Sequence, residues 1–418
     1  MVKIEKLNCG ATLITEKTDY FKSASIGIWV KSGSAYEDDR FEGISHYIEH
    51  MMFKGTSNRN AKEISDDFNR IGGNFNAFTG KEATCYYVKT LSSNICKGAE
   101  ILLDMITNSL FDEEEMNKER NVIFEEIKMV KDCPDDDIMD EISEIVNSGN
   151  SFRKNILGSP ESLNAIGRKE MLEYYENKYA RDSIVVAVTG NFNEEELKET
   201  LDKGLEALRE KGDAALEEVK PYKASSVVKV KDIEQTHICL ATPGVSIVDP
   251  MYYAYVLMNN IFGSSMSSRL FQNIREEKGL AYSVSSMNVF NSCTGFFNIY
   301  AGVAHENVKK TIDAIRHELN VLVKDGVTED ELIMAKEQVK SSYIFNLENI
   351  SSRMMALGRN MLLIGKTFSQ EEVLSGFDRV TSDDILEAAA NIGDLSSYCG
   401  AVVTNKDFDL EGLIRHGN

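Results

Sequence analysis

The order of apolar and polar residues predicts strands and helices that alternate along the first half of the chain. The apolar run 24–30 predicts a buried strand, and the alternating residues 74–87 predict a pair of strands. Helical periodicity predicts an amphipathic helix that ends at Gly72-Gly73 and a long helix from Cys96 onward. Because antiparallel-type strands are mixed with helices and β-α-β crossovers are few, we expect an α+β fold.

The second half of the chain repeats this order weakly. Residues 237–241 predict a short strand, 250–261 predict a helix, and a further helix ends at Gly279 before strand-like residues continue to Ala301. A duplicated order predicts two structurally similar domains, each an antiparallel-rich sheet packed with helices. We expect the two domains to face each other across a cleft.

The length and one charged segment suggest where the chain divides. A chain of 418 residues is too long for one ordinary core. The segment 209–224 is charged and carries Gly212 and Pro221, a composition that suits an exposed linker. We therefore predict an N-terminal domain at residues 1–215 and a C-terminal domain at residues 216–418.

Composition excludes several classes of function. The formal net charge of −21 argues against nucleic-acid binding, which needs a basic surface. No apolar run is long enough to span a bilayer, the first residues contain no apolar signal segment, and the seven cysteines form no C-x-x-C pair. We therefore expect a cytoplasmic protein with reduced thiols and with no nucleic-acid or membrane partner.

The stretch His46-Tyr47-Ile48-Glu49-His50 is the strongest candidate for chemistry. Residues four apart lie on one face of a helix, so both imidazoles can bind one ion. Neutral imidazoles suit zinc, and Glu49 can accept a proton from water that the ion activates. The pattern H-x-x-E-H is a zinc-protease signature, the inverse of H-E-x-x-H. The alternative interpretation is two surface histidines on a solvated helix.

The internal repeat favours the functional interpretation of this stretch. The corresponding positions of the second half are Ala254, Leu257 and Met258, which are all apolar. Because the duplicated scaffold places core residues there, the fold does not require the polar cluster of the first half.

A catalytic zinc ion needs a third protein ligand and an open position for water. The predicted helix after Asp112 offers Glu119, Glu125 and Glu126. Residues seven apart share a face of a helix, so Glu119 and Glu126 point together and Glu125 points about a quarter-turn away. Composition and spacing leave the choice among the three open.

Residues 43–56 and 119–127 resemble two motifs of the pitrilysin/insulinase family of inverted-zincin metallopeptidases, in its processing-peptidase-like branch of short chains. The resemblance covers essentially the whole chain. It implies one Zn²⁺ per chain, held by His46, His50 and Glu126.

The same resemblance assigns further roles. It implies that Glu49 is the general base and that Glu119 is the glutamate that helps to orient the metal site. One departure is the stretch 149–154, which stands where family members often carry a His-Pro-Leu-Gly-like sequence. We expect that departure to change the local loop and the substrate preference, and not the metal chemistry.

Candidate substrate contacts lie in both halves. The glycine-bounded residues 72–80 predict a strand that could take an extended peptide at its edge, and the resemblance implies contacts from Asn76 and Ala77. In the second half, Arg275 and Tyr282 match the family's arginine–tyrosine pair. Their N–H and O–H groups can donate to substrate carbonyls or to a developing oxyanion.

These residues predict a zinc endopeptidase that cleaves extended peptides or unfolded segments inside a closed chamber. The resemblance implies a homodimer or pairing with a related subunit. One alternative is a non-catalytic subunit that binds substrate or supports a related peptidase. Another is a non-haem Fe(II) oxygenase with two histidines and one carboxylate, which would give Glu49 no role.

Overall fold

The computed structural model describes residues 2–213, 215–216, 219–220 and 222–416, which fold into two compact units. Each unit is built from three separate segments of the chain. Unit 1 comprises Met1–Lys128, Lys154–Glu217 and Phe345–Thr367, and unit 2 comprises Met129–Arg153, Glu218–Ile344 and Phe368–Asn418.

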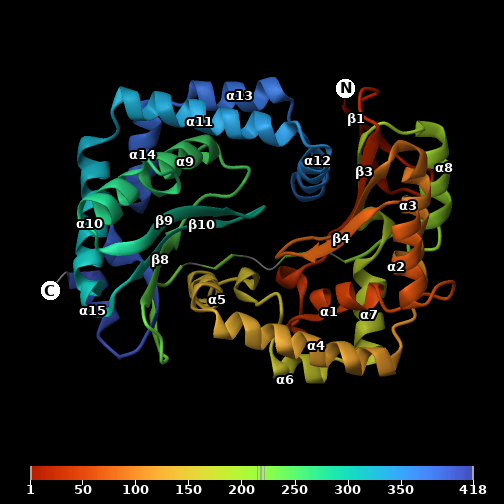
Figure 1. The fold of residues 1–418 in the computed structure, drawn as a ribbon, viewed down its shortest axis with the longest axis horizontal. Coiled ribbons are helices and arrows are strands. Elements are labelled where there is room, and N and C mark those ends of the chain that lie inside the picture. The colour runs from red at the N-terminus through yellow and green to blue at the C-terminus, as the bar shows by residue number, and fades with distance from the viewer. Residues whose placement is uncertain (1, 214, 217–218, 221, 417–418) are drawn as a thin grey trace. The chain divides into compact units, whose positions relative to one another are not determined.

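The sheet of unit 1 has six strands in the order β1-β2-β6-β3-β5-β4. Figure 1 labels β1, β3 and β4 of this sheet. β2 and β6 pair in parallel, and all other neighbours in this sheet pair antiparallel. β4 is an edge strand, so one side of its backbone has no strand partner within this sheet. The strands are β1 (Val2–Lys6), β2 (Thr12–Lys17), β3 (Ser23–Val30), β4 (Asn74–Thr79), β5 (Thr84–Leu91) and β6 (Ile184–Gly190).

The sheet of unit 2 repeats this topology with five strands in the order β7-β11-β8-β10-β9. β7 and β11 are parallel and the other pairs antiparallel, so the order and the strand directions match those of β2-β6-β3-β5-β4. The predicted α+β fold and the internal repeat are therefore confirmed. The strands are β7 (Ser226–Val230), β8 (Thr236–Pro243), β9 (Ala281–Phe290), β10 (Gly295–Val303) and β11 (Cys399–Thr404).

Helices cover one face of each sheet and form its main core. In unit 1 these are α1 (Ile44–Met52), α2 (Ala61–Arg70), α3 (Ile95–Asn108), α4 (Glu113–Asp132), α6 (Pro160–Ala165), α7 (Arg168–Lys178) and α8 (Glu194–Leu205). In unit 2 they are α9 (Tyr252–Asn259), α10 (Val308–Asp325), α11 (Glu329–Leu347), α13 (Gln370–Arg379), α14 (Ser382–Ile392) and α15 (Leu410–His416). The last residues of α4 and of α11 lie beyond the boundaries of these units.

The other face of each sheet is covered by a helix from the opposite half of the sequence. On unit 1, Met354 and Leu357 of α12 (Ile350–Ile364) pack against a cluster that includes Trp29 of β3. On unit 2, Ile138 of α5 (Pro134–Val146) packs in the same way against residues of β8 and β11. The two units therefore differ from the predicted spans 1–215 and 216–418. The segment Met129–Arg153 belongs to unit 2, and the segment Phe345–Thr367 belongs to unit 1.

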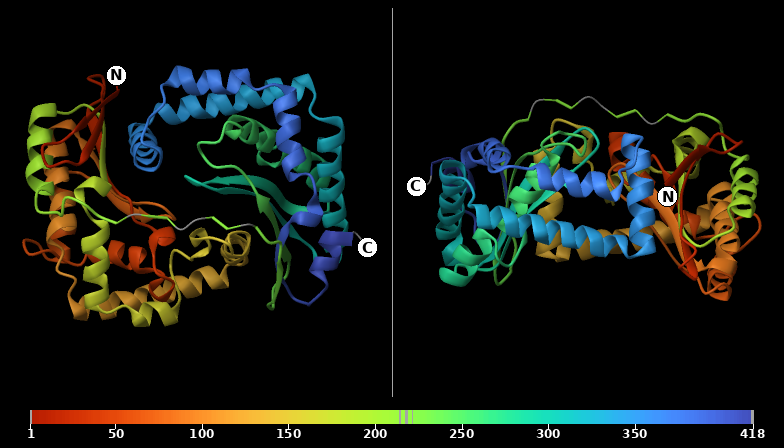
Figure 2. Two further views of the ribbon diagram at one scale, coloured as in Figure 1. Left: turned by 180° about the vertical axis from the view of Figure 1, so that it is seen from behind. Right: turned by 90° about the horizontal axis from the view of Figure 1, so that it is seen from above.

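Two further features differ from, or add to, the sequence prediction. The helix expected to end at Gly279 is wound as a π-helix over Phe271–Glu277, and α9 continues into a second π-helix at Asn260–Ser264. The described residues between 209 and 225 belong to no helix or strand (Figure 2). Residues 214, 217, 218 and 221 of the predicted linker lie outside the described residues.

Within the described part of the chain, no helix combines the length and the low polarity that crossing a bilayer requires.

The packing of α12 on unit 1 leads to a test at Gly358. A Cβ atom at Gly358 would lie 2.1 Å from Nε1 of Trp29, whereas Ala356 on the same helix is exposed. We expect Gly358→Leu to lower the free energy of unfolding by about 1–3 kcal/mol through overpacking. Ala356→Leu is the matched control and should change stability little. Thermal unfolding followed by circular dichroism measures both, and equal effects of the two variants would contradict this packing.

Candidate metal centre

Helix α1 divides into a buried face and a half-buried polar face. Tyr47 and Ile48 are fully buried in the core of unit 1. His46, Glu49 and His50 lie on the other side of the helix and are half-buried. Since the core fixes one face of α1, the spacing of these three residues places their side chains together on the opposite face.

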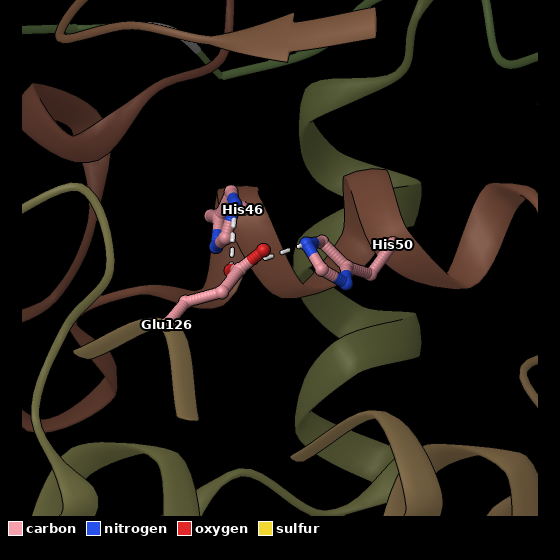
Figure 3. A group of neighbouring side chains, drawn as sticks. All are labelled: His46, His50 and Glu126. Atoms are coloured by element: carbon pink, nitrogen blue, oxygen red, sulfur yellow. Dashed lines mark ion pairs between the residues drawn. The ribbon is translucent and has the colours of Figure 1, made fainter. Parts of the chain in front are cut away.

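Helix α4 brings Glu126 to the two histidines. Its Oε2 atom lies 3.8 Å from Nε2 of His46 and 3.6 Å from Nε2 of His50 (Figure 3). One potential ligand atom from each of the three residues lies within 4.8 Å of the other two. Among the described residues, His46, His50 and Glu126 are the group of at least three His, Cys, Asp or Glu side chains whose atoms lie close enough to hold one metal ion.

The donor set and its spacing fit zinc. Zinc takes imidazole nitrogen and carboxylate oxygen at about 2.0–2.2 Å, which places tetrahedral ligands about 3.3 Å apart. The Oε2 atom of Glu126 is buried and has no hydrogen-bond partner among the described residues, and Nδ1 of His46 shares this property. A buried oxygen without a partner is costly, and a bound cation next to Glu126 would remove that cost.

Burial also favours the protonation state that metal binding needs. It lowers the pKa of His46 to about 3, and the nearby His50 adds to the shift. His46 is therefore neutral near pH 7. The short distance between His46 and Glu126 thus joins two potential metal ligands and is not an ion pair. Neutral imidazole is the form that binds metals.

Glu119 and Glu125, the other two candidates for the third ligand, lie elsewhere. The Oε2 atom of Glu119 lies 3.0 Å from Nδ1 of His50, and its Oε1 atom lies 2.6 Å from Nζ of Lys54. A carboxylate on the second ring nitrogen fixes the orientation of the imidazole and directs Nε2 toward a metal. Glu125 is exposed and accepts a bond of 2.7 Å from Lys128.

Glu49 lies beside the cluster and outside the group of possible ligands. Its Oε2 atom accepts a hydrogen bond of 2.5 Å from Oγ1 of Thr79, at the end of β4. Burial raises the pKa of Glu49, the bond from Thr79 and the charge of His50 oppose this shift, and the charge of Glu126 adds to it. A carboxyl whose pKa is raised toward neutrality suits the acceptance and return of a proton.

The expected substrate strand is β4, whose two candidate residues differ in environment. Asn76 is exposed, whereas Ala77 is 9% exposed and belongs to the core. The backbone N–H of Ala77 donates to Oδ1 of Asn76 at 2.9 Å. Both residues therefore lie on the sheet edge that reaches Glu49 through Thr79.

Arg275 and Tyr282 belong to unit 2 and are close to each other. The guanidinium carbon of Arg275 lies 5.9 Å from the ring centre of Tyr282 and 4.6 Å from that of Phe271. Tyr282 is 77% exposed. The two aromatic rings hold the guanidinium by cation–π contact. The structure thus brings Arg275 and Tyr282 together on the surface of their own unit.

The repeat now has a structural counterpart at the metal centre. Ala254, Leu257 and Met258 of α9 are all buried in the core of unit 2, at 3%, 0% and 0% exposure. In unit 2, the helix that corresponds to α1 is α9, and it therefore carries core residues at the positions where α1 carries the polar cluster.

Sequence reasoning missed two supporting side chains, Lys54 and Thr79. Each lies inside a quoted motif, and each binds a carboxylate beside the candidate ligands, Glu119 and Glu49 respectively. A polar residue at the end of a strand next to the H-x-x-E-H helix is a signal that could have indicated Thr79.

Three glutamates of α4, Glu119, Glu125 and Glu126, provide a direct test of metal binding. Glu126→Gln should abolish stoichiometric zinc binding, because it replaces a charged ligand. Glu119→Gln should weaken zinc affinity about 10- to 100-fold, because the His50 ring loses the carboxylate that fixes its orientation. Glu125→Gln is the exposed control and should bind zinc as the unmodified protein does. Zinc content by mass spectrometry and affinity by chelator competition would measure this order, and a loss of zinc in Glu125→Gln alone would contradict it.

Comparison with known proteins places this geometry in a family. Residues 12–160 match the family model described as insulinase (peptidase family M16), and residues 165–339 match the model described as peptidase M16 inactive domain. An uncharacterized zinc protease of Bacillus subtilis (strain 168) is 37% identical over 385 residues, which cover 92% of this chain and 94% of that protein. An uncharacterized zinc protease of Rickettsia felis is 36% identical over 98% of both chains.

The fold agrees with these matches. The crystal structure of a peptidase M16 inactive domain from Pseudomonas fluorescens superposes with a TM-score of 0.89 at 19% identity, over 97% of this chain and 98% of that one. The model that covers the metal cluster is the insulinase model, because its residues 12–160 include His46, His50 and Glu126. The chain belongs to the M16 family of peptidases.

Proposed function

We propose that this chain is a zinc-dependent endopeptidase that hydrolyses extended peptides or unfolded segments. The observation that carries the proposal is the convergence of His46, His50 and Glu126, with Glu49 beside them. The names of its relatives, which are called zinc proteases, support the choice of metal and of reaction class.

His46, His50 and Glu126 would hold one zinc ion per chain. The ion would supply Lewis acidity, which polarises the scissile carbonyl and makes the attacking water more acidic. Glu119 would keep His50 oriented, since it accepts from the ring nitrogen that faces away from Glu126.

Glu49 would move the protons of the reaction. Its carboxylate would accept a proton from the attacking water and return it to the amine that leaves. The hydrogen bond from Thr79 holds the carboxylate in place, and burial raises the pKa of Glu49 toward the range of a useful acid and base.

The open edge of β4 would bind the peptide backbone as an added strand. Strand addition uses backbone hydrogen bonds, so it selects an extended chain and not a particular sequence. Asn76 and Ala77 would contact the peptide, and Asn76 would release the N–H of Ala77 for that purpose. This mode explains why the proposed substrates are peptides and unfolded segments.

Arg275 and Tyr282 would donate hydrogen bonds to substrate carbonyls or to the developing oxyanion. The ion partner of the guanidinium is Glu276 at 3.6 Å, a distance beyond a hydrogen bond, so its N–H groups can serve a ligand. The proposal includes a closed chamber for the reaction, and a homodimer or a pair with a related subunit as the working assembly.

The catalytic proposal is tested at Glu49. Glu49→Gln keeps the shape of the side chain and removes the base, so cleavage of a quenched-fluorescent peptide should fall by at least about 10²- to 10⁴-fold. Zinc content should stay near one per chain, because Glu49 is not among the proposed ligands. Peptide cleavage at the unmodified rate by this zinc-loaded variant would reject the mechanism.

A non-catalytic subunit is the second candidate. The observation that favours it is the match of residues 165–339 to a model described as an inactive domain. A non-catalytic protein should show no cleavage alone, and should raise the activity of a related peptidase when the two are mixed. Cleavage by the purified chain, lost on chelation and restored by zinc, would exclude this alternative.

A further inference from the structure

The first turn of helix α1 has no cap of its own. The residue at its N-cap position is Gly43, which has φ +90° and no side chain to accept a hydrogen bond. A Cβ atom at that position would lie 2.7 Å from the carbonyl oxygen of Leu157, so a capping side chain such as Ser or Asp does not fit there. The first N–H groups of a helix need partners from elsewhere when the N-cap residue supplies none.

The carboxylate of Glu37 supplies those partners from six residues upstream. Its Oε2 atom accepts the backbone N–H of Gly43 at 2.8 Å, and its Oε1 atom accepts that of Ser45 at 2.8 Å. Glu37 is 3% exposed. A negative charge at a helix N-terminus is favoured by the helix dipole, and the two N–H groups stabilise a charge that burial alone would penalise.

Lys154 holds the backbone of Glu37 from the other side. This lysine is 2% exposed, its Nζ donates to the carbonyl oxygen of Glu37, and it lies 3.3 Å from Asp39. Its own carbonyl accepts from Oγ of Ser34 at 3.1 Å, at the start of the same loop. A buried lysine without such partners would be costly, so these contacts tie the loop 34–39 to one place.

The position of this cap explains what it can control. Ser45, which donates to Glu37, directly precedes His46, and its Oγ is 2.8 Å from the hydroxyl of Tyr174 on α7. His46 lies in the first turn of α1, whereas His50 lies one turn further on. Loss of the cap would fray the first turn and displace His46 while the rest of the helix stays packed.

We propose that Glu37, supported by Lys154, is a positioning residue that caps the metal-binding helix and sets the place of His46 relative to His50 and Glu126. Burial raises the pKa of Glu37 to about 7, and the hydrogen bonds from Ser45 and Gly43 oppose that shift. Neither Glu37 nor Lys154 touches the metal or the substrate in this proposal. The part that concerns turnover rests on the proposed peptidase function, and the part that concerns zinc affinity does not.

The test uses Glu37→Gln in the full chain, with Asp104→Asn as the matched control. An amide has one acceptor oxygen, so one of the two N–H groups loses its partner. Asp104 is also a buried carboxylate of unit 1, at 6% exposure, and it accepts from Thr56 and Arg59, which follow the C-terminal end of α1 and are not part of its first turn. Both variants should lose stability. Zinc affinity by chelator competition should fall about 10-fold in Glu37→Gln, at the lower end of the effects of outer groups on metal sites, and stay unchanged in Asp104→Asn.

Turnover gives a second readout. Glu37→Gln should lower kcat for a peptide about 10-fold with KM within about twofold, because the substrate edge is intact while the metal ligands are displaced. Lys154→Met keeps the carboxylate and removes the support of the loop, so it should shift zinc affinity in the same direction by less. If Glu37→Gln does not fold, Lys154→Met decides by the same criteria.

The outcomes separate the two proposals. Unchanged zinc affinity in a folded Glu37→Gln that loses as much stability as Asp104→Asn would overturn the positioning role. Weaker zinc binding in Glu37→Gln, in a chain whose unmodified form cleaves no peptide either alone or mixed with a related subunit, would support the positioning role and reject the peptidase function.

Discussion

The candidate site depends on one constraint: the packing of α1 and α4 must bring two imidazoles and a carboxylate into one small, half-buried volume. His46 and His50 come from α1 and Glu126 from α4, so two helices must be fixed in position and in rotation. The core fixes the buried face of α1, and Glu119 fixes the ring of His50. Among the proposed ligand atoms, Oε2 of Glu126 is buried and has no hydrogen-bond partner within the described residues, which is the arrangement that a cation stabilises.

The duplicated scaffold shows that the fold does not require the polar cluster of α1. Both units use the same strand order, and α9 of unit 2 is filled with core residues where α1 carries its polar cluster. Each sheet also receives a covering helix from the opposite half of the sequence, α12 on unit 1 and α5 on unit 2. The folding of each unit therefore depends on both halves of the chain, although each sheet has its own core.

Local features were predictable from the sequence, and long-range packing was not. The strand at 24–30, the pair at 74–87 and the helical face of His46 and His50 follow from spacing over a few residues. Spacing could not choose among the glutamates of α4, because Glu119 and Glu126 share a face and only the placement of α4 against α1 separates their environments. The exchanged helices and the cap from Glu37 join residues far apart or in different elements, and no local pattern marks them.

The most direct test of the account is the position of zinc in crystals of the purified protein. An anomalous difference map at the zinc edge should show one strong peak per chain, bound by Nε2 of His46, Nε2 of His50 and a carboxylate oxygen of Glu126, at about 2.0–2.2 Å. A peak at other residues, or no peak in zinc-saturated crystals whose His46, His50 and Glu126 are ordered, would contradict the central claim.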